Sequence, residues 1–408
     1  MFKLNLKMAW LNVWRRKVRS LLVILMIGVS MSVMLAIQGI YDGMTRHMIE
    51  STLRSETGEI SLFALSYRLH QNLTYRLKET HRIIEEMENM PEVISAVQRI
   101  RVTGLASTAR KSTLAKLVGI EIEKENLFGG LGAFVVDGAM TFGENDEGAV
   151  IGKKLAQDLS LEVGERVIFS AQDSHGELSA ISLRIKGLVR TTNMAIDDLA
   201  IFVSQEKSRV ITALGEDEST EIALRLKEGV DIDLFQSKLE KKWPGLEIYS
   251  WKALYPALEQ MQVMTNVFNG ITFAIVMTMV FIGILGVMFV SILERIREFG
   301  ILLAIGEPYR FLRTQVIYEA LILGVGGYIF GVLAGSSALL YLQSYGLDLS
   351  RFSAGLAEFG MASILYAAIK FHYFTTTFAA IVLAALLSVV LPLRRLKMLN
   401  PIEVIQGD

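Results

Sequence analysis

The sequence predicts a membrane protein with four transmembrane helices and one large α+β domain outside the membrane. Its residues are 52% hydrophobic and its mean hydropathy is +0.41, yet 20% of them are charged. An ordinary soluble protein is less apolar, and a bundle of spans alone carries fewer charges. The long apolar segments stand near the start and in the last third of the chain, which leaves residues 43–266 for an aqueous domain.

Four apolar segments are long enough to cross a bilayer, whose hydrocarbon core needs about 20 residues of helix. They predict spans at residues 20–42, 267–293, 316–342 and 374–393. The first segment is long, rich in methionine and has no small-residue cleavage site. We therefore interpret it as a span and not as a cleaved signal peptide.

Basic residues on the short flanks predict the orientation. They precede the first span, lie between the second and third, and follow the fourth: Lys3, Lys7, Arg15, Arg16, Lys17, Arg19, Arg295, Arg297, Arg310, Arg313, Arg394, Arg395 and Lys397. The positive-inside rule places such flanks in the cytoplasm. Residues 43–265 instead carry 26 basic and 33 acidic residues. We expect both termini inside the cell and the large domain outside.

Helices are expected to flank the first two spans. Residues 1–19 predict an amphipathic helix at the membrane surface, with Trp10 and Trp14 at head-group level. It serves as an anchor or contacts a cytoplasmic partner. The apolar stripe of the first span continues to Leu53, and residues 251–266 return the chain to the membrane. Both stretches predict helical stalks.

The pattern of the outer domain, residues 43–266 with its stalks, predicts an α+β fold. Alternating apolar residues predict strands at 58–64, 93–105, 114–122, 149–151, 166–170, 182–189, 199–203 and 222–226. Helical spacing predicts helices at 72–90, 155–159 and 231–242. The last strand and helix suggest a second subdomain over residues 219–249.

The cytoplasmic loop, residues 294–315, holds the segment that we expect to matter most. From Glu294 it alternates acids and bases, then presents Phe299, Ile301, Leu302 and Ile305 before Gly306. A short amphipathic helix between two spans is suited to docking into another protein. The extracytoplasmic loop 343–373 contains an amphipathic piece near 356–369, and residues 394–408 form a cytoplasmic tail.

Two features of the third span point to packing or coupling inside the membrane. Gly327, Gly331 and Gly335 repeat at every fourth position, which lets helix backbones approach closely. Glu319 is an ionisable residue near hydrocarbon, by default a functional candidate. It stands one turn inside the span, so snorkelling or pairing with Arg313 explains it equally well.

Catalytic and metal motifs are missing from the sequence. It contains no cysteine, and its five histidines stand apart in the chain. The stretch from Gly148 to Lys154 has one residue too few between its glycines for a phosphate loop. No serine nucleophile elbow occurs, and a net charge of −1 gives no nucleic-acid signal. We predict a non-catalytic chain that binds no metal and no cofactor and draws energy from a partner.

Several motifs, in order along the chain, resemble the FtsX/MacB-type ABC transporter permeases. The segment ERIREFGILLAIG at 294–306 is similar to their coupling segment, typically ERxREIGIxxAxGA. The stretches 315–327, 392–404 and 150–165 are similar to the start of their third span, their C-terminal ending and part of their outer domain. Residues 57–62 and 118–121 most resemble the lipoprotein-releasing LolC/LolE-type branch. Leu302, Leu303, Glu307 and Pro308 depart from the family pattern.

The resemblance implies a MacB-like periplasmic core and a permease that acts by mechanotransmission in a bacterial inner membrane. A cytoplasmic ABC ATPase dimer would use ATP and Mg, dock on residues 297–306 and move the stalks. The implied partners are a second permease copy or paralogue, a lipoprotein or lipid-like cargo, and, as an optional addition, a periplasmic carrier. The residues that we expect on the coupling segment are Arg297, Glu298, Phe299, Gly300, Ile301, Leu302, Leu303, Ala304, Ile305 and Gly306.

An apolar cavity between two copies is the expected cargo site. Its predicted wall is Met34, Ile37, Ile40, Met44, Met264 and Phe268, although for any single methionine lipid-facing packing is a simpler role. Two alternatives stay open. One is a MacB-like efflux permease, and the other is an FtsX-like regulator of a cell-wall hydrolase.

Overall fold

The computed structural model describes residues 2–142, 147–191, 193–352, 355 and 364–397. The chain divides into two compact units. The helical unit comprises Met1–Thr45, Gln262–Arg351 and the chain from Ile364, and the α+β unit comprises Arg46–Met261. Most of the predicted amphipathic piece at 356–369 and the tail motif at 400–404 lie outside the described residues.

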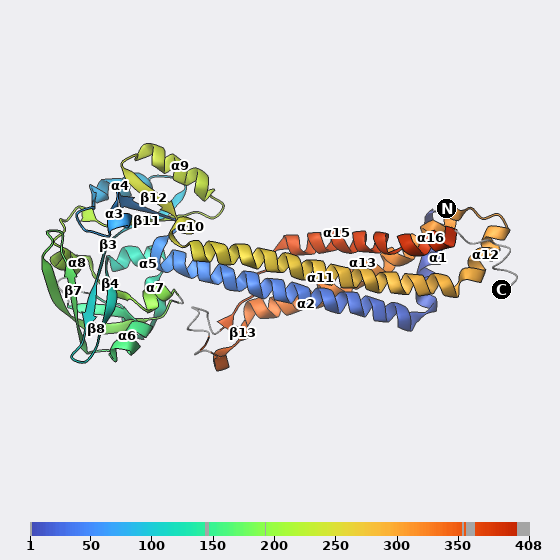
Figure 1. Ribbon diagram of the computed structural model, residues 1–408, viewed down its shortest axis with the longest axis horizontal. Coiled ribbons are helices and arrows are strands. Elements are labelled where there is room, and N and C mark those ends of the chain that lie inside the picture. The colour runs from blue at the N-terminus through green and yellow to red at the C-terminus, as the bar shows by residue number, and fades with distance from the viewer. Residues whose placement is uncertain (1, 143–146, 192, 353–354, 356–363, 398–408) are drawn as a thin grey trace. The chain divides into compact units, whose positions relative to one another are not determined.

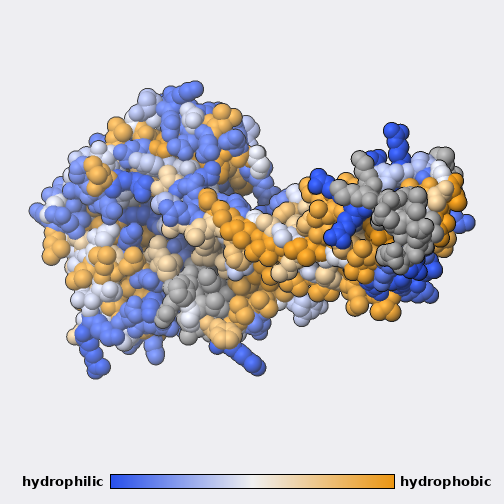
Figure 2. Space-filling view, turned by 45° about the vertical axis from the view of Figure 1, so that its right-hand side comes forward, coloured by the Kyte–Doolittle hydropathy of each residue, from blue (hydrophilic) through white to orange (hydrophobic). Residues whose placement is uncertain are grey.

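Four helices within the described residues are long and apolar enough to cross a membrane. They are α2 (Lys17–Thr52), α11 (Pro256–Glu294), α13 (Tyr309–Ser344) and α15 (Phe371–Ser388). Each contains most or all of one predicted span, and they run side by side in the helical unit (Figure 1). Figure 2 shows hydrophobic side chains gathered along these helices. The protein is therefore an α-helical membrane protein with four spans.

The predicted stalks are continuous with the first two spans. Helix α2 extends past residue 42 to Thr52, and the π-helix η1 (Leu53–Thr57) follows it. Helix α11 already begins at Pro256, well before the predicted second span. Shorter elements near the spans are α1 (Phe2–Arg15), α12 (Ile296–Ala304), α16 (Val390–Lys397), η3 (Ser350–Phe352), β13 (Leu347–Asp348) and β14 (Ile364–Leu365).

The α+β unit is built on a mixed sheet. Among the described residues, ten strands join it in the order β12-β1-β11-β3-β4-β9-β6-β8-β5, with β7 pairing β3 and β8. The strands are β1 (Ile60–Ala64), β3 (Val93–Ser107), β4 (Ser112–Ile120), β5 (Val135–Gly138), β6 (Gly148–Gly152), β7 (Arg166–Gln172), β8 (Leu178–Val189), β9 (Ala200–Ser204), β11 (Glu221–Leu226) and β12 (Leu246–Ser250). The pairs β4/β9 and β6/β8 are parallel, and the other pairs are antiparallel.

Helices and a small second sheet complete the α+β unit. The helices are α3 (Tyr67–His70), α4 (Thr80–Glu88), α5 (Ile122–Phe128), α6 (Lys153–Leu159), α7 (Met194–Asp197), α8 (Gln205–Thr212), α9 (Ile232–Lys242), α10 (Trp251–Leu254) and the 3-10 helix η2 (Leu131–Phe134). The small sheet pairs β2 (Leu77–Lys78) with β10 (Glu218–Ser219). Every predicted strand appears, with its bounds shifted by a few residues.

The long strand β3 takes part in the two largest hydrophobic cores of the α+β unit. Its first half pairs with β11, and its second half pairs with β4 and β7. One core gathers Ile60, Ile84, Leu224 and Phe235 from β1, α4, β11 and α9. The other includes Leu117, Leu155, Phe169, Ile201 and Ile211. The predicted second subdomain at 219–249 is therefore too small, because β1 and α4 complete its core.

One predicted helix is wrong in its first half. The apolar spacing over 72–90 predicts a single helix, but only Thr80–Glu88 forms α4. Upstream, Asn72 accepts hydrogen bonds from the backbone and hydroxyl of Thr74, and Leu77–Lys78 pairs with β10. A side chain that bonds its own backbone offers an alternative to the helix. Helices α5 and α8 are not predicted from the sequence.

Candidate functional site

The coupling segment forms the short helix α12 between α11 and α13. The helical conformation ends before Gly306, where φ is +95°. Glycine adopts this left-handed conformation without a Cβ clash. The N–H groups of Gly306 and Glu307 donate to the carbonyls of Leu303 and Leu302. This is the bonding of a Schellman motif, and it ends the helix at a defined residue.

The two faces of α12 have different surroundings. Phe299 is only 1% exposed in the core of the helical unit, and Leu302 and Leu303 pack partly buried beside it. Ile301 and Ile305 are 53% and 74% exposed. We define the coupling face as the exposed residues of this stretch, namely Arg297, Glu298, Ile301, Ala304, Ile305 and Gly306. Phe299, Gly300, Leu302 and Leu303 instead attach α12 to the bundle.

Glu319 links α13 to two other elements on the same side of the bundle. It is 4% exposed, and its Oε1 accepts hydrogen bonds from Arg295 at 2.9 Å and from Asn12 at 2.7 Å. It therefore does not snorkel, and its cationic partner is Arg295 and not Arg313. Removing one partner from a buried ion pair of this kind strongly destabilises the protein, because the remaining charge is left buried and unpaired. The sequence gives no signal for Asn12 as a partner.

Further ion pairs hold α1 and the coupling helix together. Arg295 also pairs with Glu298 at 3.0 Å, and Arg15 reaches Glu298 at 3.1 Å. The hydrogen bond from Arg295 holds the pKa of Glu298 below its usual range. Arg19 pairs with Glu294 at 2.6 Å. Helix α1 therefore contacts the coupling helix, and the start of α2 contacts the end of α11, through charged side chains.

The three glycines of α13 lie against α2. A Cβ on Gly327 would stand 2.6 Å from Ile27, and one on Gly331 would stand 2.7 Å from the sulfur of Met31. A Cβ on Gly335 would come within 2.8 Å of Leu35. These distances are closer than real side-chain contacts allow, so glycine is what permits this helix spacing.

The residues proposed as a cavity wall differ in burial. Met34 is 1% exposed and is therefore buried in the structure. Ile37, Ile40 and Met44 of α2 are half-buried, whereas Met264 and Phe268 of α11 are exposed. Tyr41 and Phe268 place their ring centroids 4.8 Å apart, which brings the two helices together at this level.

The structure contains a buried charge network in the α+β unit that the sequence does not predict. Arg101 of β3 donates to Glu56 of η1 at 3.0 Å and forms an ion pair with Glu221 of β11. Asn193 donates to Glu56 at 2.7 Å, and the hydroxyl of Tyr255 also donates to it. The network ties the end of the first stalk to two strands and to the residue preceding α11.

Charge compensation keeps Arg101 protonated in this network. Burial alone would lower the pKa of Arg101, but the carboxylates of Glu221 and Glu56 raise it above its usual range. Burial and the nearby carboxylate of Glu56 raise the pKa of Tyr255, so its hydroxyl stays a donor. These partners are far apart in the sequence, and no spacing rule could have paired them.

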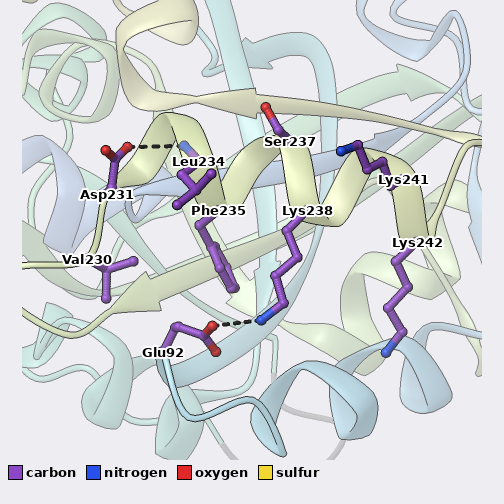
Figure 3. A pocket seen from close by; sticks show the side chains of 9 residues that line it. All are labelled: Glu92, Val230, Asp231, Leu234, Phe235, Ser237, Lys238, Lys241 and Lys242. Carbon is purple, nitrogen blue, oxygen red and sulfur yellow. Dashed lines mark hydrogen bonds and ion pairs between the residues drawn. The ribbon is translucent and has the colours of Figure 1, made fainter.

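The α+β unit also carries an open cavity of about 710 Å³ along α9. Figure 3 shows its lining, which combines the apolar Val230, Leu234 and Phe235 with three lysines of α9. One of these, Lys238, is paired with Glu92 at 2.6 Å, and another, Lys242, with Glu86 at 2.9 Å. Within the described ranges, no group of three His, Cys, Asp or Glu side chains is placed to hold a metal ion.

These features define a membrane protein with four spans, a mixed-sheet outer domain and a short helix between its second and third spans. The family model of the MacB-like periplasmic core domain matches residues 20–242, more than half of the chain. The model of the FtsX-like permease C-terminal region matches residues 270–401. The chain belongs to this MacB- and FtsX-like permease family, and its α+β unit is extracytoplasmic.

Two curated relatives match parts of the chain. The macrolide export ATP-binding/permease protein MacB of Hyphomonas neptunium is 29% identical over 104 residues, 26% of this chain and 16% of that protein. An uncharacterized ABC transporter permease of Methanocaldococcus jannaschii is 31% identical over 157 residues, 37% of this chain and 42% of the relative. The matched regions therefore span less than half of each relative.

Solved structures resemble the outer domain. The periplasmic region of MacB from Actinobacillus actinomycetemcomitans matches at 13% identity and a TM-score of 0.34, covering 51% of this chain and 95% of that one. The extracellular domain of the noncanonic ABC-type transporter YknZ from Gram-positive bacteria matches at 15% identity and a TM-score of 0.32, covering 47% of this chain and 99% of that one. With TM-scores below 0.5, the family assignment rests on the family models.

Proposed function

We propose that this chain is the permease subunit of an ABC transporter that works by mechanotransmission. The observation that carries the proposal is the coupling face of α12, where Ile301 and Ile305 stay exposed while Phe299 packs into the bundle. Apolar area on a charged cytoplasmic helix favours burial against a partner by about 25 cal/mol per Å². A cytoplasmic ABC ATPase dimer that uses ATP and Mg is the proposed partner.

Coupling requires the ATPase to favour one arrangement of the permease over another. A ligand shifts a conformational equilibrium only by the difference in its affinity for the two states. The Arg295–Glu319 ion pair at 2.9 Å gives α12 a direct connection to α13, and Asn12 extends it to α1. Movement of α12 would then be transmitted to the spans.

We place the protein in a bacterial inner membrane, with both termini cytoplasmic and the outer domain in the periplasm.

For the cargo, we propose a lipoprotein or lipid-like molecule drawn from the outer leaflet. The exposed Met264 and Phe268, beside the half-buried Ile40 and Met44, support an apolar wall that a second copy or paralogue would complete. An acyl chain that leaves the bilayer loses about 0.8 kcal/mol of favourable burial free energy per CH₂. Its extraction therefore needs an apolar wall to receive the chain and ATP to drive the step. A periplasmic carrier would receive the cargo. The likeness to a macrolide export protein favours efflux as the second candidate.

The coupling face can be tested without disturbing the fold. Ile305→Asp places a charge on a side chain that is 74% exposed, so the bundle should fold normally while the ATPase dissociates. The measurement is the amount of ABC ATPase that co-purifies with the tagged chain, together with its ATP turnover in nanodiscs. Ile305→Leu is the matched control and should retain both. Undiminished co-purification with Ile305→Asp would contradict the docking proposal.

The cargo is tested on the same reconstituted complex. Acylated lipoprotein should stimulate ATP turnover and leave the nanodisc for a soluble carrier. Stimulation by a macrolide but not by lipoprotein would instead establish efflux. If neither changes turnover while a cell-wall hydrolase is activated by the outer domain, the FtsX-like regulatory role is correct.

A further inference from the structure

A polar cavity of about 320 Å³ opens in the helical unit, at the ends of three spans that face the extracytoplasmic domain. Ligand pockets in proteins are commonly about 300–1,000 Å³. The predicted first span ends at residue 42, the second begins at 267 and the fourth at 374, which puts the cavity at the level of the outer head groups. It is lined by Gln38, Asp42, Asn266, Asn269, Gly270, Phe273, Lys370, His372, Tyr373 and Thr376.

The charged centre of this cavity is Asp42. This carboxylate is 7% exposed, and it accepts hydrogen bonds from Lys370 at 2.5 Å, from Asn269 at 3.1 Å and from the hydroxyl of Tyr373. An ionisable group buried among spans is costly and by default a functional candidate. The coupling helix lies on the other side of the membrane, so Asp42 has no part in ATPase docking.

Close backbone contact brings Lys370 to Asp42. The N–H of Ala368 donates to the carbonyl of Gly39 at 2.8 Å. A Cβ on Gly43 would stand only 1.9 Å from the carbonyl oxygen of Tyr366. The segment before α15 therefore lies against α2, and the arrangement of the cavity is built into the fold.

The cavity leaves complementary polar groups for a ligand. Asn269 must direct its Nδ2 at the Asp42 carboxylate, because two acceptors would repel each other, and this fixes the orientation of the amide. Among the described residues, its buried Oδ1 then has no hydrogen-bond partner. Lys370 offers three N–H donors, of which Asp42 takes one, and His372 lines the same cavity. A ligand that satisfies both sides needs an N–H or O–H donor and an anionic oxygen.

A glycine opens one wall of the cavity. A Cβ on Gly270 would meet no heavy atom within 4 Å, so the space beside it is empty. Glycine inside a helix costs about 1 kcal/mol relative to alanine, and nothing in the packing of α11 requires it here. Phe273, one turn further along α11, adds an apolar surface on the membrane side.

We propose that this cavity binds the phosphoethanolamine head group of a membrane phospholipid. The phosphate would lie against Lys370 and His372. The primary ammonium would donate to Asn269 Oδ1 and lie toward the carboxylate of Asp42. Choline carries no N–H or O–H donor, and the hydroxyls of phosphatidylglycerol donate without the charge that strengthens the hydrogen bond of an ammonium. The cavity therefore selects phosphatidylethanolamine over both, and this selection requires neither the ATPase nor any particular cargo.

The test uses the full-length chain alone, in nanodiscs with equal amounts of phosphatidylethanolamine, phosphatidylcholine and phosphatidylglycerol. Native mass spectrometry measures which lipid stays bound as the surrounding bilayer is removed. We expect phosphatidylethanolamine to exceed phosphatidylcholine by about fivefold to tenfold, since one otherwise unsatisfied buried acceptor is worth about that much. Equal retention of the three lipids would overturn the proposal.

Two glycines of α11 provide a matched pair of variants. Gly270→Phe should fill the cavity and abolish the preference, whereas Gly286→Phe, which also enters open space, should keep it. Asn269→Leu removes the unsatisfied acceptor and should equalise phosphatidylethanolamine and phosphatidylcholine even if Gly270→Phe fails to fold. A preference that survives both Gly270→Phe and Asn269→Leu overturns the site.

Soluble ligands of the same chemistry identify the source of the head group. Free phosphoethanolamine or inorganic phosphate, added at millimolar concentration, should leave the bound lipid in place because neither carries acyl chains. Displacement of the lipid by either compound would overturn the proposal that the ligand is a lipid. The cavity would then be a site for a soluble phosphate compound.

Discussion

Arg99 and Glu125 illustrate how single residues set the stability of the outer domain. Both side chains are 2% exposed, and Nη2 of Arg99 donates to Oε2 of Glu125 at 2.7 Å. The guanidinium also lies 4.9 Å from the ring centroid of Phe128. A buried ion pair adds little over an apolar pair, but a single buried charge without its partner is strongly unfavourable.

Arg99→Met should therefore lower the free energy of unfolding by about 3–5 kcal/mol, because Glu125 is left buried and unpaired. The double variant Arg99→Met/Glu125→Leu should recover most of this loss. The measurement is denaturant unfolding of the full-length chain in detergent. Arg166→Met is the control, because its ion pair with Glu147 is about half exposed and should contribute less than about 1 kcal/mol. Equal losses in the single and double variants would contradict the argument.

At the scale of elements, the contact between α2 and α13 depends on small residues. Ile27, Met31 and Leu35 of α2 each face one glycine of α13, with the same four-residue step on both helices. Lipid is as apolar as these side chains, so close van der Waals packing is what holds such helices together. The three contacts act as one surface, and a side chain at any of the glycines would separate the helices along the others.

Gly331→Leu should destabilise the helical unit by about 1–3 kcal/mol, since its Cβ alone would come within 2.7 Å of Met31. Thermal unfolding of the purified chain in detergent measures the change. Leu333→Met, at a side chain that is 65% exposed on the same helix, is the control and should have little effect. A Gly331→Leu variant as stable as the control would show that the helices are not in contact here.

At the scale of the whole molecule, two helices join the compact units. Helix α2 and helix α11 each run without a break from one compact unit into the other. Near the boundary, the hydroxyl oxygens of Thr45 and Thr265 are 3.0 Å apart. Within the α+β unit, the network of Glu56, Arg101 and Tyr255 holds the outer ends of the same two segments.

A disulfide between α2 and α11 should separate ATP hydrolysis from transport. The chain has no native cysteine, so Thr45→Cys/Thr265→Cys introduces one defined pair. If the helices shift against each other during the cycle, the complex of the oxidised double variant with its ATPase should hydrolyse ATP but release no cargo, and reduction should restore release. Each single variant is a control. Normal cargo release by the fully oxidised protein would exclude relative movement of these helices.

Much of this architecture could be predicted from residue patterns alone. Apolar length specifies the four spans, and alternation specifies the strands of the outer domain, because both depend on neighbours in the sequence. The coupling helix and its end at Gly306 follow from the same kind of local signal. The helix predicted over 72–90 was half wrong where Asn72 formed a local turn and residues 77–78 joined β10.

The charged and polar sites, in contrast, depended on tertiary structure. Glu319 stood out as an isolated acid, but its partners are Arg295, which lies between α11 and α12, and Asn12 of α1. Asp42 meets Lys370, which lies 328 positions away in the chain. Hydrogen bonds and ion pairs act over a few ångströms, and the sequence carries no measure of such distances between remote residues. The sequence by itself thus determined the spans and the short helix between the second and third spans, and only the fold decided which buried charges meet.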